Sequence, residues 1–521
     1  MIPAEAPNER LRRVAMRLGT LAVAVVVVGC SPAPPSVPPS AGGPATTAAA
    51  SAPAASRIPA AEPSLAAALR DAVDPSAILE DLERLQGIAQ ANEGNRAAGS
   101  RSEAEAAQFV ADELREAGFN VELQDVTLPW FSQDAPSVLE VDGAARPFED
   151  LHDFKAMLLS PSGDVRGPIH SLAFDPAASP GDRSGLGCDE TDFADVPAGA
   201  IVLVRPGPCF RRDVIVNAQE AGAVAIVTVY PEFQRDTVLR PTLIDQSGLE
   251  IPALAASNDV GLALLEAAQR GGDGHIVVET TVEDRTSVNV IAETAGGAED
   301  HVLIIGGHLD SSVDGPGIND NGSGTMTILE IGRQLAAAAT GPQSGAGDGW
   351  KVRIAFWTGE EIGLLGSGAY VEALDSTDVG AIEAYLNFDM LGSSNGVREV
   401  YDSAQTTRPA ESAAVAALFT SAFDRVGLSS TVKEVGGGAD HASFNNFGIP
   451  TGGLFSGASE IKTPEQAALF GGTAGSPTDA CYHLACDTPA NIDPVRLEEM
   501  ARAAAWVVGA LASGEVTLRA S

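Results

Sequence analysis

The feature that most constrains the fold is a repeated order of strand, glycine-rich turn and helix between residues 288 and 426. It occurs three times, with strands expected at 302–305, 352–357 and 385–388 and helices expected at 325–338, 364–374 and 411–426. Alternation of this kind predicts helices packed on both faces of a mostly parallel sheet. We therefore expect a three-layer α/β/α sandwich with a mixed, mostly parallel central sheet. In such folds, chemistry gathers at the carboxyl ends of the strands.

Side chains suited to metal binding follow these strands or lie in loops. They are His308, Asp320, Glu360, Glu361, Asp389 and, near the C-terminus, His483. Imidazole and carboxylate groups are both good zinc ligands, and one carboxylate can bridge two metal ions. Two histidines and three carboxylates therefore suit a pair of zinc ions. Of the adjacent glutamates, one can bind metal while its neighbour faces the catalytic water.

These residues belong to five short motifs that occur in a fixed order. The motifs are HLDS at 308–311, NDNGSG at 319–324, TGEE at 358–361, NFDM at 387–390 and CYH at 481–483. Together they resemble the di-zinc aminopeptidases of clan MH, which include aminopeptidase Y and the secreted actinobacterial aminopeptidases. The resemblance covers residues 61–131 and 286–515. It implies the zinc-exopeptidase sandwich and two zinc ions per chain.

The resemblance also implies a role for each metal ligand. His308 and Asp389 are expected to bind one zinc ion, while Glu361 and His483 bind the other. Asp320 is expected to bridge the two ions. The substrates implied are peptides with a free N-terminus, from which an apolar, leucine-like residue is removed.

Three further residues receive roles from the same resemblance. Glu360 is expected to act as the general base, and Tyr482 is expected to hydrogen-bond the oxyanion. Asp310 is not a ligand in this family; we expect it to orient His308 from behind, as a carboxylate often does for a zinc-bound imidazole. The Asp320–Asn321 bond matches a position where the family often has a non-proline cis peptide.

Residues 132–285 have a different sequence pattern, which predicts short strands separated by turns rich in proline and glycine. The pieces GAIVLV at 199–204, CF at 209–210, NA at 217–218, AGA at 221–223 and IPA at 251–253 resemble a protease-associated (PA) domain. We expect strands at 200–204 and 223–229 and a helix at 212–221. The usual role of such a domain is a lid or substrate-access module without catalytic residues.

The N-terminus carries an export signal. Four arginines within residues 10–17 precede an apolar run, Leu18 to Val28, that is too short to span a bilayer as an ordinary helix. The run ends in VVGC at 27–30, which resembles a bacterial lipobox and implies lipidation of Cys30. A plain secretory signal with an incidental cysteine is the alternative. Residues 31–60 are rich in proline, alanine and serine and are typical of a disordered tether.

The predicted organisation has four parts: a lipoprotein signal peptide at 1–30, the tether at 31–60, a peptidase domain from 61–131 and 286–515, and the PA domain at 132–285. The protein is expected to be exported, to face outward and to contact the membrane only through its lipid anchor. A form shed from the cell is the other possibility.

The other four cysteines form two local pairs, Cys188 with Cys209 and Cys481 with Cys486. An exported protein meets an oxidising compartment, so two disulfides are expected. Zinc binding by these cysteines is the competing interpretation, and their spacing disfavours it.

The chain has 32 basic and 70 acidic residues and a formal net charge of −38. Such a balance argues against nucleic acid as a partner, because phosphates would be repelled. It is typical of a soluble acidic surface, with a minor contribution to cation binding. We expect a monomer.

Three other functions remain open at this point. Another exopeptidase on the same fold, a carboxypeptidase or dipeptidase, is the first; a carboxypeptidase would need a basic pocket, and few basic residues lie near the motifs. A glutaminyl cyclase needs fewer ligands than are present. A binding protein without activity is disfavoured because every ligand and Glu360 are retained. The remaining histidines are expected to be structural or at the surface: His152, His170, His275 and His301, with His441 hard to place.

Overall fold

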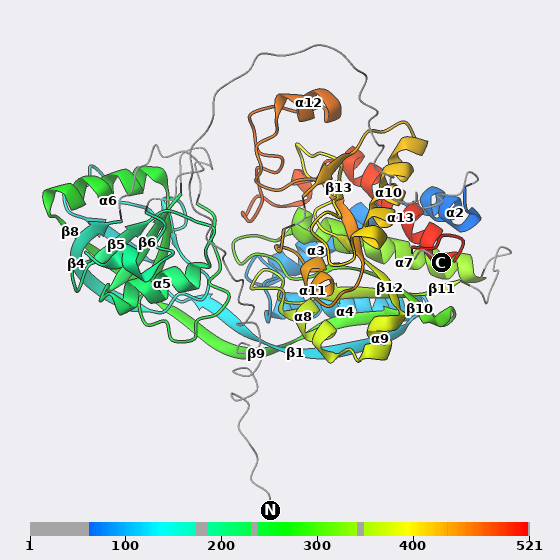
Figure 1. Cartoon of the computed structure of the whole chain (residues 1–521), viewed down its shortest axis with the longest axis horizontal. Helices are drawn as coiled ribbons and strands as arrows, with labels where there is room; N and C mark the ends of the chain where they lie inside the picture. Colours follow the sequence, from blue (N-terminus) through cyan, green and yellow to red (C-terminus); the bar gives the residue numbers. More distant parts are fainter. Residues whose placement is uncertain (1–61, 173–184, 231–237, 341–348, 435, 519–521) are drawn as a thin grey trace, which may run out of the picture. The chain divides into compact units, whose positions relative to one another are not determined.

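The computed structural model describes residues 62–172, 185–230, 238–340, 349–434 and 436–518. The predicted signal peptide, Cys30 and the tether lie outside these residues. Within the described part, the chain forms two β-sheets with their covering helices (Figure 1). No helix of that part combines the length and apolarity needed to cross a membrane.

The larger sheet has eight strands and is mixed. Its strands are β1 (Asn120–Gln133), β9 (Thr280–Glu293), β10 (Ala298–His308), β11 (Trp350–Trp357), β12 (Ile382–Phe388), β13 (Glu399–Tyr401), β14 (Thr431–Lys433) and β15 (Thr451–Phe455). They lie in the order β1-β9-β11-β10-β12-β15-β13-β14. The pairs β11–β10, β10–β12 and β12–β15 are parallel, whereas β1–β9 and β9–β11 are antiparallel. The predicted mixed sheet with a parallel centre is confirmed.

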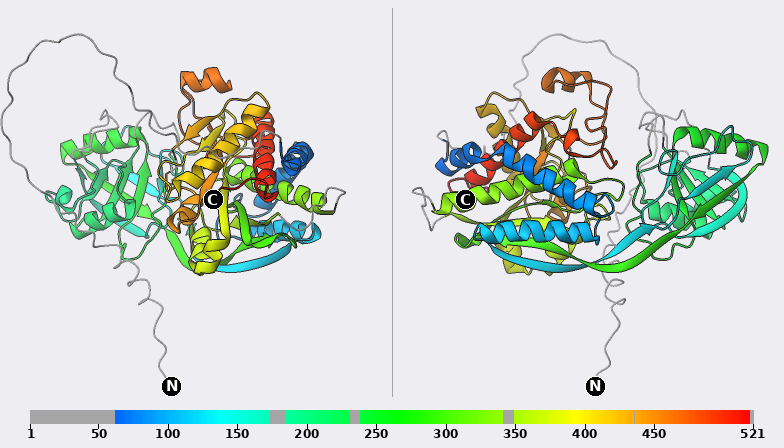
Figure 2. Two further views of the ribbon diagram at one scale, coloured as in Figure 1. Left: turned by 45° about the vertical axis from the view of Figure 1, so that its right-hand side comes forward. Right: turned by 180° about the vertical axis from the view of Figure 1, so that it is seen from behind.

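Helices cover both faces of this sheet, because its central strands are apolar on both sides. One face packs against α2 (Ser64–Ala72), α3 (Pro75–Ala91), α4 (Arg101–Glu116), α7 (Gly324–Thr340), α10 (Pro409–Arg425) and α13 (Pro494–Ala512). Figure 2 shows α3, α4 and α13 gathered over that face in the view from behind. The other face packs against α8 (Leu365–Ala373), α9 (Ser376–Ala381) and α11 (His441–Asn446). The three-layer sandwich is therefore confirmed.

Strand β10 shows how the sequence specifies both faces. Leu303 and Ile305 point into the core under α7 and α13, while Val302 and Ile304 join the opposite core, which is built around Trp357. Alternating side chains of a strand point to opposite faces, so an unbroken apolar run can fill two cores. That run carries the chain to His308 at the strand's carboxyl end.

The smaller sheet has seven strands and lies between β1 and β9 in sequence. Its strands are β2 (Val138–Val141), β3 (Phe154–Ala156), β4 (Gly163–Ser171), β5 (Ile201–Val204), β6 (Ala225–Val229), β7 (Ala253–Ala256) and β8 (Asp273–Val278). They lie in the order β2-β8-β4-β5-β6-β7-β3. Helices α5 (Arg211–Glu220) and α6 (Asn258–Arg270) belong to this part. The strands expected at 200–204 and 223–229 and the helix at 212–221 match β5, β6 and α5.

Strands β1 and β9 connect the two sheets. They pair over their full length, from Asn120 opposite Glu293 to Gln133 opposite Thr280. The chain enters the smaller sheet after β1 and leaves it before β9, so this part is an insertion in the larger one (Figure 1).

Both expected disulfides are present, Cys188–Cys209 and Cys481–Cys486. The first closes a loop before α5. The second joins cysteines five positions apart in sequence, and His483 lies between them.

Candidate metal and catalytic site

The candidate ligands meet at one edge of the larger sheet because three parallel strands end there. In the parallel register, His308 at the end of β10 lies beside Trp357 at the end of β11. Glu360 and Glu361 follow Trp357 after a short turn, and Asp389 directly follows β12. The expectation that these side chains gather at the strands' carboxyl ends is thus correct.

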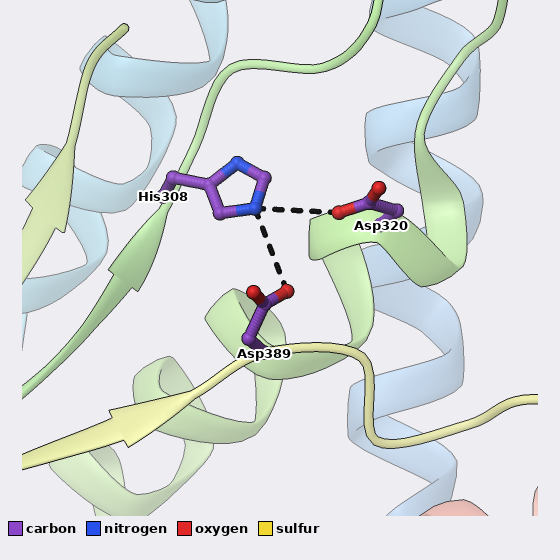
Figure 3. A group of neighbouring side chains, drawn as sticks. All are labelled: His308, Asp320 and Asp389. Atoms are coloured by element: carbon purple, nitrogen blue, oxygen red, sulfur yellow. Dashed lines mark ion pairs between the residues drawn. The ribbon is translucent and has the colours of Figure 1, made fainter. Parts of the chain in front are cut away.

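Two ligand clusters share Asp320. His308 Nε2 lies 3.3 Å from Asp320 Oδ1 and 3.5 Å from Asp389 Oδ1 (Figure 3). His483 Nε2 lies 3.0 Å from Asp320 Oδ2 and 3.0 Å from Glu361 Oε2. The ligand atoms of each cluster lie within 4.8 Å of one another. Each oxygen of Asp320 therefore faces a different cluster, as a bridging carboxylate must.

The chemistry of these groups fits zinc. His308 Nδ1 lies 3.1 Å from the backbone oxygen of Asp310, to which it donates its proton, so that the Nε2 lone pair faces the carboxylates. Glu361 Oε1 and Asp389 Oδ1 are buried and have no hydrogen-bond partner among the described residues. Buried carboxylate oxygens without donors are costly unless a cation compensates them. Nitrogen and oxygen ligands in this number suit zinc.

Asp320 lies in a short helical segment, Ile318–Ser323, which is interrupted at Asp320 and Asn321. The Asp320–Asn321 peptide bond is cis, as the resemblance implied. Burial alone would raise the pKa of Asp320, but hydrogen bonds from His308 and His483 outweigh it and lower the pKa. Asp320 is therefore held in its charged form, which is the form that binds metal.

Asp310 lies behind His308, and its expected role in orienting the imidazole stays a prediction. Its carboxylate lies 3.7 Å from His308 Nδ1, within ion-pair distance. It also accepts the backbone N–H groups of Glu360 and Glu361, at 3.2 and 3.3 Å. The hydrogen bond from His308 Nδ1 goes to the backbone oxygen. Asp310 thus contacts the imidazole and the turn carrying both glutamates at once.

Glu360 and Tyr482 line the same pocket as the metal ligands, a cavity of about 750 Å³. Burial raises the pKa of Glu360, the neighbouring carboxylates of Asp440 and Asp389 raise it further, and His308 opposes them. The Tyr482 ring stacks on the His483 ring at 3.8 Å between centroids. Burial and nearby carboxylates raise the pKa of Tyr482, so its hydroxyl keeps the proton it would donate.

Comparisons with known proteins agree with this geometry. Residues 289–508 match peptidase family M28, and residues 173–264 match the PA domain. An aminopeptidase of Pseudomonas aeruginosa is 35% identical over 447 residues, which are 83% of this chain and 80% of that protein. The chain belongs to peptidase family M28.

Other relatives support the assignment. Leucine aminopeptidase 2 of Trichophyton tonsurans is 34% identical over 438 residues, covering 83% of each chain. The probable lipoprotein aminopeptidase LpqL of Mycobacterium tuberculosis is 34% identical over 457 residues, covering 85% of this chain and 86% of that protein. The solved aminopeptidase from Aneurinibacillus sp. strain AM-1 has the same fold, with a TM-score of 0.67 at 23% identity, covering 88% and 98% of the two chains. Membership of M28 makes the protein a zinc-dependent hydrolase.

Three buried residues of this M28 site received no role from the sequence. Arg96 donates hydrogen bonds to the backbone oxygens of Leu309, Pro316 and Gly317, in the loop between His308 and Asp320. Glu103 accepts hydrogen bonds from the Thr358 and Ser287 hydroxyls. Asp440 is buried near Glu360, and burial raises its pKa to about 7. Their roles depend on contacts between distant segments, which leave no local signal in a sequence.

The other histidines lie mostly outside the site. His275 sits between Glu140 and Asp164, and His301 contacts Glu383. His152 contacts Asp153, and His170 lies on β4 of the smaller sheet. His441 does line the pocket; its Nε2 lies 2.9 Å from the Gly436 oxygen, and burial lowers its pKa to about 4. His441 is therefore neutral at working pH and is absent from both ligand clusters.

Proposed function

We propose that this M28 protein is a di-zinc aminopeptidase that removes N-terminal residues from peptides. The observation that carries the proposal is the pair of ligand clusters sharing Asp320, with Glu360 in the same pocket. Relatives identical at about a third of the aligned positions are named aminopeptidases. Two zinc ions follow from the two clusters, one per cluster.

Zinc bound at these clusters supplies Lewis-acid chemistry: it polarises the scissile carbonyl and lowers the pKa of the attacking water. His308, Asp389 and Asp320 would hold one ion, and Glu361, His483 and Asp320 the other. Glu360 takes the proton from the attacking water and passes it to the leaving amine. Its raised pKa suits a group that must both accept and release a proton near neutral pH.

Tyr482 donates a hydrogen bond from its hydroxyl to the substrate's carbonyl oxygen as negative charge develops there. Such a hydrogen bond strengthens in the transition state and therefore raises the rate. The ring stacked on His483 and the Cys481–Cys486 disulfide beside it hold Tyr482 in place.

The preference for apolar N-terminal residues rests on a cluster beside the ligands. Met390, Tyr401, Phe455 and Ala458 pack together with Tyr482, and all five line the pocket. Met390 directly follows the ligand Asp389, so an apolar side chain placed here keeps its backbone near the metals. Burying a leucine-sized side chain contributes about 2 kcal/mol. The relatives named leucine aminopeptidases fit this preference.

Hydrolysis of leucine p-nitroanilide, beside its N-acetylated twin, tests the proposal. The exported chain with zinc should cleave only the free-amine substrate. Chelation should abolish cleavage and zinc should restore it, and metal analysis should find two zinc ions per chain. Glu360→Gln should lower kcat by about 10²- to 10⁴-fold and keep the zinc. Cleavage of the blocked twin would overturn the aminopeptidase assignment in favour of an endopeptidase or amidase.

We further propose that Cys30 anchors the exported protein through a lipid. The support is the lipobox-like VVGC at 27–30 and the relative named a lipoprotein aminopeptidase. Cys30→Ala should move the protein from the membrane fraction to the soluble fraction or retain it as an unprocessed precursor. Unchanged fractionation and an unchanged N-terminus would overturn the anchor.

A further inference from the structure

One wall of the catalytic pocket comes from the inserted PA part. Arg211, Tyr230, Arg240, Thr242 and Ile244 line the same cavity as the metal ligands. Ile244 packs closely against the turn after Glu361, because a Cβ placed on Gly363 would lie 2.9 Å from Ile244 Cγ2. The segment around Ile244 therefore lies beside the turn that carries Glu360 and Glu361.

Two of the cations that line the pocket are already neutralised. Arg240 Nε lies 3.2 Å from Asp314 Oδ1, and its Nη1 donates to Gln133 and to the Ala156 oxygen. Lys433 Nζ lies 2.8 Å from Glu460 Oε1 and sits over the Phe455 ring. Neither has charge to spare for a ligand.

Arg211 differs from them. Its neighbours are uncharged: Nη1 donates to the Thr242 backbone oxygen at 3.4 Å, and the guanidinium lies close enough to the Tyr230 hydroxyl to lower the pKa of that group against the effect of burial. No carboxylate pairs with it in the part of the chain that the structure describes. An arginine without a carboxylate partner is unexpected in a chain with 70 acidic and only 32 basic residues. Arg211 is exposed, and within the described ranges most of its five N–H groups have no acceptor.

The arrangement suggests what an unpaired arginine can bind there. An aminopeptidase takes the substrate's amine and scissile carbonyl at the metals, so the rest of the peptide must extend through the remaining pocket. A guanidinium binds carboxylates through two parallel hydrogen bonds. Every peptide with a free C-terminus carries one carboxylate, and acidic side chains add others.

We propose that Arg211 binds a substrate carboxylate on the leaving-group side of the scissile bond, and that the enzyme therefore prefers short peptides whose C-terminal carboxylate reaches Arg211. The inference rests on the aminopeptidase function proposed above. It assigns the PA wall a part in substrate selection, with Tyr230 and Thr242 holding the guanidinium in position.

Leucyl peptides of increasing length, Leu-Gly to Leu-Gly-Gly-Gly-Gly, test it as free acids and as C-terminal amides. The zinc-loaded chain should cleave the free acid at least about tenfold better than the amide at one preferred length, since a charge-assisted hydrogen bond contributes a factor of this size or more. Arg211→Gln should remove that ratio, mainly by raising KM for the free acid. Arg211→Lys keeps the positive charge but loses the paired donors. It should therefore keep only part of the preference for the free acid over the amide.

Arg166→Gln is the matched control, because Arg166 is an exposed arginine on β4 that is absent from the pocket lining. It should leave the acid-to-amide ratio as in the wild type. Amides with one aspartate after the scissile bond show whether a side-chain carboxylate can replace the terminal one; recovery of the Arg211-dependent rate supports carboxylate recognition.

An acid-to-amide ratio near one at every length, or a ratio that Arg211→Gln leaves unchanged, would overturn the proposal. These results differ from failure of the proposed function, in which leucine p-nitroanilide itself would not be cleaved.

Discussion

At the scale of single residues, Asp310 connects two parts of the site. Its backbone oxygen accepts the His308 Nδ1 proton, and its carboxylate accepts two backbone N–H groups, those of Glu360 and Glu361. The carboxylate is fully buried. One residue thereby fixes a candidate ligand of each cluster, His308 and Glu361, and the candidate general base Glu360.

Asp310→Asn should therefore reduce activity without removing a ligand. An amide has one acceptor oxygen and cannot accept both N–H groups as a carboxylate does. We expect zinc affinity or kcat to fall about 10- to 100-fold, as for other groups that support metal ligands. Zinc titration and steady-state kinetics measure this. Asp300→Asn, at an exposed position on β10, the strand that precedes Asp310, is the control; equal effects at both positions would contradict the role of Asp310.

Glu103 makes stability depend on pH. Burial raises its pKa from the ordinary 4.5 to about 8, and the nearby Asp310 adds to the shift. Between these values the folded state binds more protons than the unfolded state, so stability falls as pH rises, by about 1.4 kcal/mol per pH unit at most. Glu103→Gln removes this titration.

The melting temperatures of the zinc-loaded wild type and of zinc-loaded Glu103→Gln should therefore diverge between pH 5 and pH 8. The wild type should lose stability relative to Glu103→Gln as pH rises, because the glutamine resembles the protonated acid. A difference that stays constant over this range would show that Glu103 titrates normally in the folded protein.

At the scale of elements, the C-terminal loop supports the turn that carries Asp320. Asp487 accepts the backbone N–H groups of Asn319 and Asp320, at 2.9 and 3.1 Å. Asn319 in turn donates to Asp479 at 2.6 Å. His483 lies between these two aspartates in sequence, so one loop supplies a ligand and positions the bridging carboxylate.

Asp487→Ala should leave two buried N–H groups without an acceptor. Each lost partner costs about 1–3 kcal/mol, and the displaced turn should also bind zinc more weakly. Urea unfolding and zinc titration measure the two effects separately. Asp487→Asn keeps one acceptor oxygen and should fall between wild type and alanine. An alanine variant as stable as the wild type would refute the link between loop and turn.

At the scale of the whole molecule, the site joins segments far apart in the sequence. Its candidate ligands come from three strand ends, one interrupted turn and the C-terminal loop, and the PA part supplies a wall of the pocket. Asp314, in the loop between His308 and Asp320, connects that loop to the PA part. It pairs there with Lys155 at 2.9 Å and with Arg240 at 3.2 Å. Zinc binding should therefore stabilise the assembled fold.

Removal of zinc should lower the melting temperature, because the buried carboxylates then repel one another without a cation between them. A ligand present at 100 times its Kd stabilises the folded state by about 2.7 kcal/mol. Thermal unfolding with chelator, and again after zinc is restored, measures the shift. Glu360→Gln keeps all five ligands and should show a shift of similar size. No shift in either protein would mean that zinc does not bind the folded chain.

The sequence alone determined the local elements and the ligand types. Apolar runs such as that of β10 are read from neighbouring residues, and the helices and strands expected from them agree with the structure within a few residues. Ligands placed directly after strands, such as His308 and Asp389, also follow from local order. Parallel strands must end at the same edge, so their meeting could be predicted.

Only the tertiary structure decided which groups support those ligands. The carboxylate of Asp310 accepts backbone N–H groups of the turn at Glu360, and Arg96 is buried against the loop beyond His308. Arg211 lies far from the catalytic motifs in sequence yet lines their pocket. Periodicity records which residues are buried within an element, but hydrogen bonds and charge pairs between distant segments depend on how the elements pack.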